Sequence, residues 1–397
     1  MPDVTATLQP EGAAVEPGCE AVAEEFARNF TDRGELGAAF ALYRGGRLVV
    51  DLWGGVADSR TGRPWGRDTL QIIFSGSKGI VVTALLLLVE REQLRLDDAV
   101  ARYWPEFAAA GKHGITIRQV ATFTAAMPAL RVSVSQDDIL DARAMAALLA
   151  AQEPESDPRA HGLMYGPFTS GWIIGELVRR VDGRPLDAFF RQEIARPHGL
   201  DLHFGVPDRD LARVARTEYG TEFLAQFSGF FANADPLTRR VWSNPMPFPP
   251  HEDLWSARER LQALIPAVNV AGTARDFARL YGMLAEDAMR APGERPHLLS
   301  RPVLDDARGV HVRATDPLID VPMSYGGGGY RLRTQPRPGP DGVSFGHDGG
   351  GGSANQAWPR VGAGVSYVMN RLIALGPDDR RASSLLSAAA SALTVHD

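Results

Sequence analysis

The residues best suited to covalent chemistry in this sequence are a serine and a lysine three positions apart. They lie in residues 74–79, Phe-Ser-Gly-Ser-Lys-Gly, directly before a long apolar run. Three residues are close to one turn of an α-helix, so the Ser75 hydroxyl and the Lys78 amine are expected on one face. An amine that is neutral at working pH can take the proton of a hydroxyl. We therefore interpret Ser75 as an acyl-carrying nucleophile and Lys78 as its base.

The position of Ser75 and the scarcity of lysine both support this interpretation. A serine at the start of a helix lies beside unpaired backbone N–H groups and the positive end of the helix dipole, which favour a developing oxyanion. Of the 42 basic residues only Lys78 and Lys112 are lysines. Arginine cannot act as a base in this way, whereas lysine can. A biased genome composition would deplete lysine equally, so the contrast supports Lys78 without deciding the matter.

The elements that must position this pair follow from the spacing of apolar residues. Two strand-like runs around a Gly-Gly turn predict a hairpin near the N-terminus, at 37–43 and 47–53. Helical periodicity then dominates to about residue 290, and strand patterns return in the last hundred residues. The predicted helices are 20–30, 80–91, 139–151, 170–181, 186–196, 273–284 and 379–393, and the later predicted strands are 330–334, 343–347 and 364–369.

This order predicts an α/β (α+β) fold in which an antiparallel sheet flanked by helices begins at the N-terminus and is completed at the C-terminus. A mostly helical insertion lies between the two parts. We expect a sheet domain made of residues 1–75 and 315–397, and a helical domain of residues 76–314 that contains Lys78.

Composition excludes several classes of function. A net charge of −6 and the lack of a basic cluster argue against nucleic-acid binding. The single cysteine, Cys19, cannot form an internal disulfide, and no Cys/His spacing indicates a metal site or another cofactor. The N-terminus has no secretory signal, and the longest apolar run, 80–89, is too short to span a membrane. We expect a cytoplasmic enzyme without a membrane partner.

Two further patterns are weaker candidates for a site. The glycine runs 326–329 and 349–352 border predicted strands, whereas a dinucleotide fingerprint needs a helix to follow. Residues 342–346 fit the Gly-x-Ser-x-Gly elbow, which would make Ser344 the nucleophile. That elbow requires a strand turning sharply into a helix, but here a glycine run follows.

The segment around Ser75 and Lys78 resembles the Ser-x-x-Lys box of class C β-lactamases, penicillin-binding proteins and family VIII carboxylesterases. The resemblance extends over nearly the whole chain, through segments more specific than the box itself. It implies a β-lactamase/transpeptidase-like fold and a small-molecule ester or acyl-donor substrate. The similar segments are 47–58, 103–107, 265–269, 279–281 and 367–371.

The resemblance also assigns the remaining site residues. Tyr165 stands eighteen residues before Gly183, where the family has the tyrosine that shares the base role with lysine. Both groups have ordinary pKa values near 10, so each is expected to need a lowered pKa near neutrality. The third box of the family corresponds to His347, Asp348 and Gly349, which are expected to line the substrate site. The backbone N–H groups of Ser75 and Gly350 would form the oxyanion hole.

Departures from the family pattern indicate an altered pocket. Pro167 stands where β-lactamases have asparagine, and His347 replaces their lysine, so strong β-lactamase activity is not expected. Residues 123–128 replace the usual His-Thr-x-Gly-Leu-Pro, and 355–358 replace a plainer stretch. We therefore expect Phe123 and Trp358 to contact substrate.

The favoured function is hydrolysis of small esters by a carboxylesterase mechanism with an acyl-enzyme on Ser75. Acyl transfer to an alcohol or amine is the main alternative. An amidase or D-aminopeptidase-like hydrolase, and a catalytically silent binder that kept the fold, remain open as well.

Overall fold

A ten-stranded antiparallel sheet forms the centre of the molecule, in the order β1-β3-β2-β14-β13-β12-β11-β10-β9, with β4 paired to β3. The computed structural model describes residues 13–155, 162–232, 234–250, 252–291, 293–333, 339, 343–374 and 379–394. The strands are β1 (Ala14–Val15), β2 (Gly37–Arg44), β3 (Arg47–Asp58), β4 (Arg63–Pro64), β9 (Val310–Asp316), β10 (Val321–Gly326), β11 (Arg331–Arg333), β12 (Ser344–Gly346), β13 (Ala354–Trp358) and β14 (Ala363–Met369).

The two ends of the chain meet inside this sheet. β2 from the N-terminal hairpin pairs with β14 near the C-terminus, and Phe40 lies opposite Tyr367. The predicted sheet, begun at one end of the sequence and completed at the other, is thereby confirmed. The division into two domains stays a prediction.

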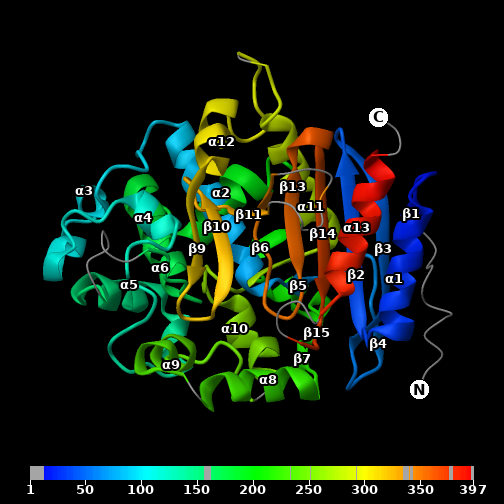
Figure 1. Cartoon of the computed structure of the whole chain (residues 1–397), viewed down its shortest axis with the longest axis horizontal. Coiled ribbons are helices and arrows are strands. Elements are labelled where there is room, and N and C mark those ends of the chain that lie inside the picture. The colour runs from blue at the N-terminus through cyan, green and yellow to red at the C-terminus, as the bar shows by residue number, and fades with distance from the viewer. Residues whose placement is uncertain are drawn as a thin grey trace.

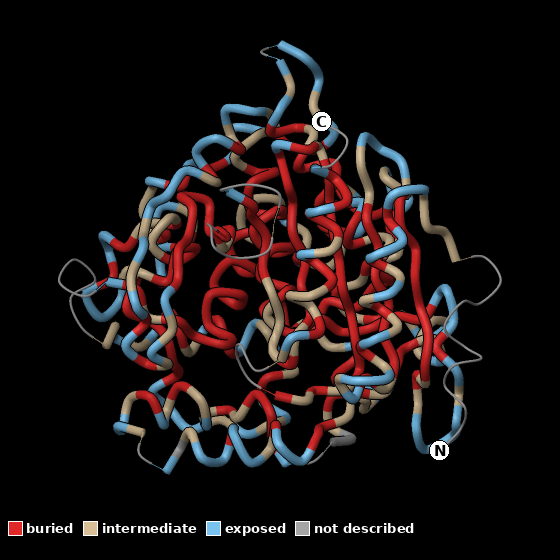
Figure 2. Tube along the Cα trace, turned by 45° about the vertical axis from the view of Figure 1, so that its right-hand side comes forward, coloured by how far each residue is buried: buried red, intermediate tan, exposed pale blue. Residues whose placement is uncertain are grey.

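Helices cover both faces of the sheet. α1 (Glu20–Asp32) and α13 (Arg381–Thr394) pack on each other over one face, in front at the right of Figure 1. α11 (Ala274–Asp287) packs on β14, β2 and β13 from the other face. Figure 2 shows the strands and the helices behind them as a continuous buried region. Among the described residues, none of the helices combines the length and the apolar character needed to cross a bilayer.

The remaining helices lie mainly beside and behind the sheet, on the left of Figure 1. Two small sheets accompany them: β5 (Gln71–Ile72), β8 (Val270–Gly272) and β6 (Leu202–Phe204) in one, β15 (Arg371–Leu372) and β7 (Glu218–Tyr219) in the other. The helices are α2 (Ser77–Glu90), α3 (Val100–Tyr103), α4 (Ile117–Ala121), α5 (Ala142–Ala151), α6 (Thr169–Asp182), α7 (Leu186–Phe190), α8 (Thr221–Ala232), α9 (Pro236–Ser243), α10 (Arg258–Gln262) and α12 (Arg301–Arg308).

Two predicted helices differ from the observed ones. The predicted helix 139–151 is broken at Asp141, whose side chain accepts hydrogen bonds from the N–H groups of Arg143 and Ala144 and so begins α5 anew. The predicted helix 186–196 passes from α7 into a π-helical turn, Arg191–Ala195. The hairpin β9–β10 was not predicted, because β9 is largely exposed and lacks a strong apolar alternation. Residue 334 of the predicted strand 330–334 lies outside the described residues.

A buried ionic cluster holds the C-terminal helix against the sheet. Arg381 pairs with Glu35 at 2.8 Å and with Asp379 at 2.7 Å, and all three side chains are nearly inaccessible to solvent. The hydroxyl of Tyr367 on β14 donates to the second Glu35 oxygen. Burial raises the pKa of Glu35, and the charge of Arg381 opposes that shift. The cluster therefore depends on Arg381 remaining in place.

We expect Arg381→Met to lower the free energy of unfolding by about 3–5 kcal/mol, because it leaves buried carboxylates without their counter-charge. Urea denaturation of both proteins measures the loss. Arg301→Met is the matched control, since Arg301 and Asp305 form an exposed pair worth about 0–1 kcal/mol. Equal losses in the two variants would contradict the role given to the cluster.

Candidate active site

The backbone just before Ser75 is strained and held by aromatic packing. Ser75 lies in the 3₁₀ turn Phe74–Gly76 that leads into α2. Phe74 has φ +44°, a left-handed conformation that is costly for a bulky residue. Its ring centroid lies 5.3 Å from that of Phe248 and 5.5 Å from that of Trp255. These contacts fix the turn that presents the Ser75 hydroxyl.

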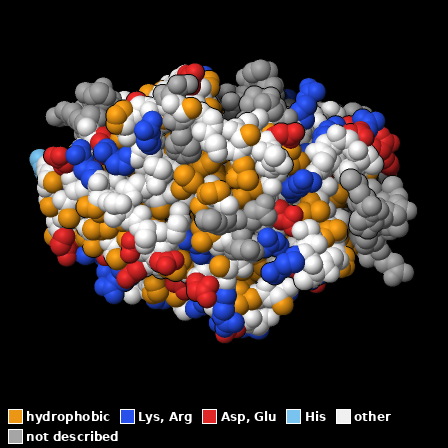
Figure 3. Space-filling view, turned by 90° about the horizontal axis from the view of Figure 1, so that it is seen from below, with side chains coloured by type: hydrophobic (Ala, Val, Ile, Leu, Met, Phe, Trp, Pro, Cys, Tyr) orange, Lys and Arg blue, Asp and Glu red, His pale blue; other side chains and the backbone are white. Residues whose placement is uncertain are grey.

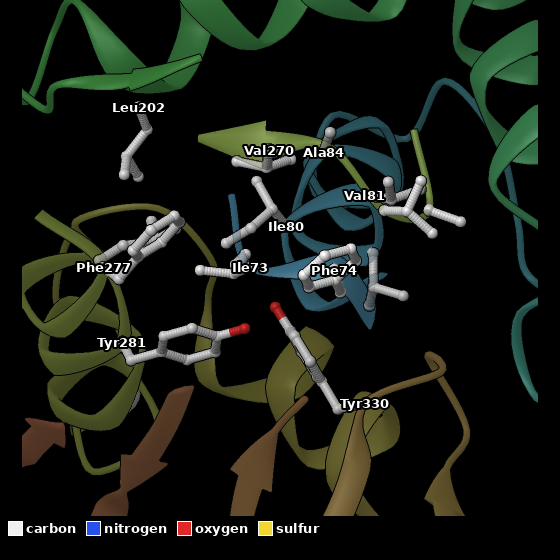
Figure 4. Close-up of a cluster of buried hydrophobic side chains, with 14 of the residues drawn as sticks. Ile73, Phe74, Ile80, Val81, Ala84, Leu202, Val270, Phe277, Tyr281 and Tyr330 are labelled. Carbon is white, nitrogen blue, oxygen red and sulfur yellow. The ribbon is translucent and has the colours of Figure 1, made fainter. Parts of the chain in front are cut away.

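The first turns of α2 are fixed by hydrogen bonds from distant segments. The N–H of Val270 on β8 donates to the Ser77 hydroxyl at 3.0 Å. Thr83 bonds the Gly79 carbonyl at 2.8 Å and the Tyr330 hydroxyl at 2.9 Å. Figure 4 shows the Tyr330 ring beside α2, with Phe74 and apolar side chains of the helix packed above it. α2 therefore cannot shift without breaking contacts to both sheets.

The structure brings Ser75, Lys78 and Tyr165 together. Lys78 Nζ lies 3.2 Å from Ser75 Oγ, and the Tyr165 hydroxyl donates to the same oxygen at 2.8 Å. Lys78 Nζ lies 5.0 Å from the centroid of the Tyr165 ring. A serine hydroxyl is thus contacted by an amine and a phenol, although Tyr165 is ninety positions away in sequence.

Two backbone carbonyls orient the amine of Lys78. Nζ donates to the Pro167 carbonyl at 2.7 Å and to the Ala267 carbonyl at 3.3 Å. Burial lowers the pKa of Lys78 well below its ordinary value. A neutral amine has two hydrogens and one lone pair, and the two carbonyls accept the hydrogens. The lone pair is then free to accept the proton of Ser75.

The pKa of Tyr165 shifts in the opposite direction from the one expected. Burial raises the pKa of its phenol to about 12, against a smaller lowering effect of the hydrogen bond to Ser75. The expectation that its pKa falls together with that of Lys78 was wrong, because the dominant effect on both groups is loss of solvation. Burial favours the neutral amine and the neutral phenol alike. Tyr165 is therefore a proton donor in the resting site.

A buried carboxylate that the sequence did not single out holds the backbone of Tyr165. Asp316, at the end of β9, accepts a hydrogen bond from the Tyr165 N–H at 2.5 Å and from the Leu318 N–H at 2.8 Å. Burial raises the pKa of Asp316, and these backbone hydrogen bonds lower it. The link joins the sheet to the segment before α6.

A family model described as Beta-lactamase matches residues 23–390 of the sequence. The chain belongs to this family. The match includes every residue of the site described above.

Relatives of this beta-lactamase family member carry hydrolase names. "Esterase/beta-lactamase LipL" of Mycobacterium tuberculosis is 33% identical over 379 residues, which cover 91% of this chain and 83% of the relative. A penicillin-binding protein homologue from Caulobacter crescentus is 34% identical, with a TM-score of 0.85 over 96% of this chain and 98% of its own. A family VIII carboxylesterase structure is 31% identical, with a TM-score of 0.84 over the same shares. The chain is a serine hydrolase with the fold expected from its sequence.

His347, in the segment that corresponds to the family's third box, forms an uncharged wall of the site. His347 is 1% exposed, and its ring centroid lies 6.2 Å from that of Tyr165. Its Nδ1–H donates to the Asp348 carbonyl at 2.8 Å, while Nε2 faces the Tyr325 hydroxyl at 3.5 Å. Burial lowers the pKa of His347 well below its ordinary value, so the ring is uncharged at neutral pH. The carboxylate of Asp348 is paired with Arg333.

The turn after His347 lies against the nucleophile loop. A Cβ on Gly349 would come within 2.1 Å of the Ile73 carbonyl oxygen, and one on Gly350 within 2.5 Å of the Phe248 ring. Both positions therefore require glycine. Within the described part of the chain, no hydrogen bond uses the Gly350 N–H. That N–H is thus available to a ligand beside Ser75.

Aromatic side chains form the wall of the site next to Tyr165. The ring centroid of Phe123 lies 4.9 Å from those of Tyr165 and Tyr325, and Trp242 of α9 stacks on Tyr165 at 6.4 Å. Phe123 has φ +61°, a second strained position at the site. In the view from the end that carries α8, hydrophobic side chains gather near the middle of the surface (Figure 3).

Two sequence candidates lie away from this wall. Trp358 is fully buried at the end of β13, and its Nε1–H donates to Gln356 at 3.0 Å, so its expected contact with substrate stays a prediction. Ser344 is buried in β12, which leads through a turn into strand β13 and not into a helix. Gly342 of its motif lies outside the described residues. The elbow arrangement that Ser344 would need is therefore missing.

We expect kcat/KM to rise with pH through the lowered pKa of Lys78, because only the neutral amine accepts the Ser75 proton. The rate should stay high until Tyr165 loses its proton, near its pKa of about 12. Lys78→Arg keeps a positive charge throughout, so it should lose about 10²–10⁴ of the rate and the rise with pH.

Steady-state rates on one ester, measured from about pH 5 to about pH 10, test this expectation. Lys112→Arg is the matched control, since Lys112 bonds the Ala109 carbonyl outside the site. A Lys78→Arg enzyme with the wild-type profile would contradict the role of Lys78.

Proposed function

We propose that this serine hydrolase is a carboxylesterase that works through an acyl-enzyme on Ser75. The observation that carries the proposal is the Ser75 oxygen held between the amine of Lys78 at 3.2 Å and the phenol of Tyr165 at 2.8 Å. One group can accept a proton and the other can donate one, as ester cleavage requires.

Acylation follows from this geometry. Lys78 takes the Ser75 proton while Oγ forms a bond to the ester carbonyl carbon. The oxyanion of the tetrahedral intermediate accepts hydrogen bonds from the N–H groups of Ser75 and Gly350. As the intermediate collapses, the bond to the alcohol oxygen breaks and Tyr165 gives that oxygen a proton. Lys78 returns its proton to Tyr165, and the alcohol leaves.

Deacylation reverses the same transfers with water in place of the alcohol. The neutral Lys78 removes a proton from water, whose oxygen bonds to the acyl carbon, while Tyr165 stays protonated to give a proton to Ser75 Oγ. The second tetrahedral intermediate then expels Ser75 Oγ, which regains its proton, and the acid is released. Both half-reactions therefore use one set of groups.

Three features favour esters over β-lactams. Pro167 offers only its carbonyl, which Lys78 occupies, so no side-chain amide is available there to hold a lactam substituent. His347 is neutral and buried where a lysine would hold a carboxylate. The aromatic wall of Phe123 and Trp242 suits apolar groups. We expect nitrocefin, a chromogenic β-lactam, to be cleaved much more slowly than p-nitrophenyl butyrate.

Intact-mass spectrometry after mixing with p-nitrophenyl butyrate tests the acyl-enzyme, which should map to Ser75. Ser75→Ala should abolish the adduct and the turnover, and Tyr165→Phe should lower kcat by about 10²–10⁴ because it removes the proton donor. Tyr103→Phe, which loses only a hydrogen bond to Asp98, is the control. Full turnover by Ser75→Ala would overturn the mechanism.

The same assay separates the alternatives. Added alcohol or amine should leave free acid as the main product of an esterase, whereas a transferase would form the new ester or amide ahead of it. An amide substrate cleaved faster than the matched ester would indicate an amidase, and a Ser75 that is never acylated would indicate a silent binder.

A further inference from the structure

One cation near the site, Arg331, has no role in the proposed proton transfers. Arg331 begins β11 and is half-buried. Among the residues that the structure describes, its guanidinium makes no hydrogen bond and no ion pair. Arg333, two positions along the same strand, is paired with Asp348. The guanidinium of Arg331 is not among the buried polar groups that lack a partner, so it reaches solvent and is open to a charged ligand.

The strand register places Arg331 on the face of the sheet that carries the site. Arg331 is the cross-strand partner of Tyr325 on β10 and of Gly346 on β12. Directly opposed residues of an antiparallel pair project from the same face. The Tyr325 ring contacts Phe123, and its hydroxyl faces His347 Nε2. The Arg331 side chain therefore projects from β11 on the same face of the sheet as the aromatic wall.

The charge of Arg331 reaches the groups around Ser75. It lowers the pKa of Tyr165 and of Tyr325, against the larger raising effect of burial. It also adds to the burial that lowers the pKa of His347. In solution, salt screens the interaction between two exposed charges that lie more than about 10 Å apart. The guanidinium thus contributes to the electrostatic field in which the substrate is held.

None of the other charged groups described near the site forms a direct ion pair with Arg331. Asp316 feels Arg331, but both of its oxygens accept backbone hydrogen bonds, from Tyr165 and Leu318. Asp348 is occupied by Arg333. Burial lowers the pKa of both Lys78 and His347, and neither of these groups can offer Arg331 a negative charge. Asp316 is therefore the carboxylate whose charge Arg331 feels, while the Arg331 guanidinium itself is free of a direct ion pair among the described residues.

We propose that Arg331 binds a carboxylate on the substrate, so that the preferred esters are anionic. This inference rests on the proposed esterase function and names its substrate class. A guanidinium pairs with a carboxylate through two parallel hydrogen bonds, which fixes orientation as well as affinity. The carboxylate lies on the acyl part or on the alcohol part of the ester, and matched substrates distinguish the two.

Two substrate pairs test the proposal. For the acyl part, mono-p-nitrophenyl glutarate is compared with p-nitrophenyl pentanoate, which has the same chain length and no charge. For the alcohol part, 4-(butyryloxy)benzoate is compared with its methyl ester. In one of the two pairs, Arg331→Gln should lower kcat/KM for the anionic ester by about 10- to 100-fold, as expected for a charge-assisted hydrogen bond. The neutral ester should be unaffected.

Two further variants make the test specific. Arg313→Gln removes the same charge from an exposed residue of β9 that pairs with Ser324 and so projects from the opposite face. In each substrate pair, this variant should leave the ratio of kcat/KM for the anionic ester to kcat/KM for the neutral ester unchanged. Arg331→Lys keeps the positive charge but loses the planar, forked guanidinium. It should retain part of the preference for the anionic ester, and high salt should weaken that preference.

An Arg331→Gln enzyme that keeps the wild-type ratio in both pairs, or loses activity equally on anionic and neutral esters, would overturn the proposal. That outcome leaves the esterase function intact, because neutral esters still acylate Ser75. Failure of the esterase function would look different, with no turnover of any of the four esters by the wild-type enzyme and no adduct on Ser75.

Discussion

Removal of the Lys78 amine from water is the constraint on which the rest of the structure depends. An ammonium ion is disfavoured in an apolar interior, so burial lowers the pKa of Lys78 and favours the neutral amine. The surrounding helix supplies the apolar environment, since Ile80 and Val81 are buried together with Lys78. The Pro167 and Ala267 carbonyls supply enough polarity to orient the amine without restoring its charge. A base of suitable strength therefore results from packing and not from a neighbouring charge.

The remaining parts of the fold keep this arrangement in register. Asp316 connects the edge of the main sheet to the backbone of Tyr165, and Ser77 connects α2 to β8. The glycine turn after β12 packs closely on the loop before Ser75, since a Cβ on Gly349 would lie 2.1 Å from the Ile73 carbonyl oxygen. Sheet, helical region and turn each contribute one part of the catalytic group. None of these parts would be placed correctly by its own local sequence.

How well the sequence predicts a structural feature depends on how far apart in the chain the interacting residues lie. The Ser75–Lys78 pair is a local property of one helix turn, and the alternation of strands and helices predicted a sheet begun near the N-terminus and completed near the C-terminus. Tyr165 could be assigned only through resemblance to a family, since nothing within a few residues marks it as catalytic. Asp316 and Arg331 could not be distinguished from the other charged residues, because their importance comes from cross-strand neighbours. The role of Trp358 could not be derived from its position in the sequence, because all five residues of β13 are buried and no alternation marks one face.

The insertion of β14 between β2 and β13 affects how the protein is made. While the last segment of the chain is still inside the ribosome, the N-terminal hairpin lacks a neighbour on its inner edge, and the partners of Glu35 have not emerged. Newly made chains should therefore keep an open strand edge until β14 has emerged from the ribosome, which is a period of exposure to misassembly and to chaperones.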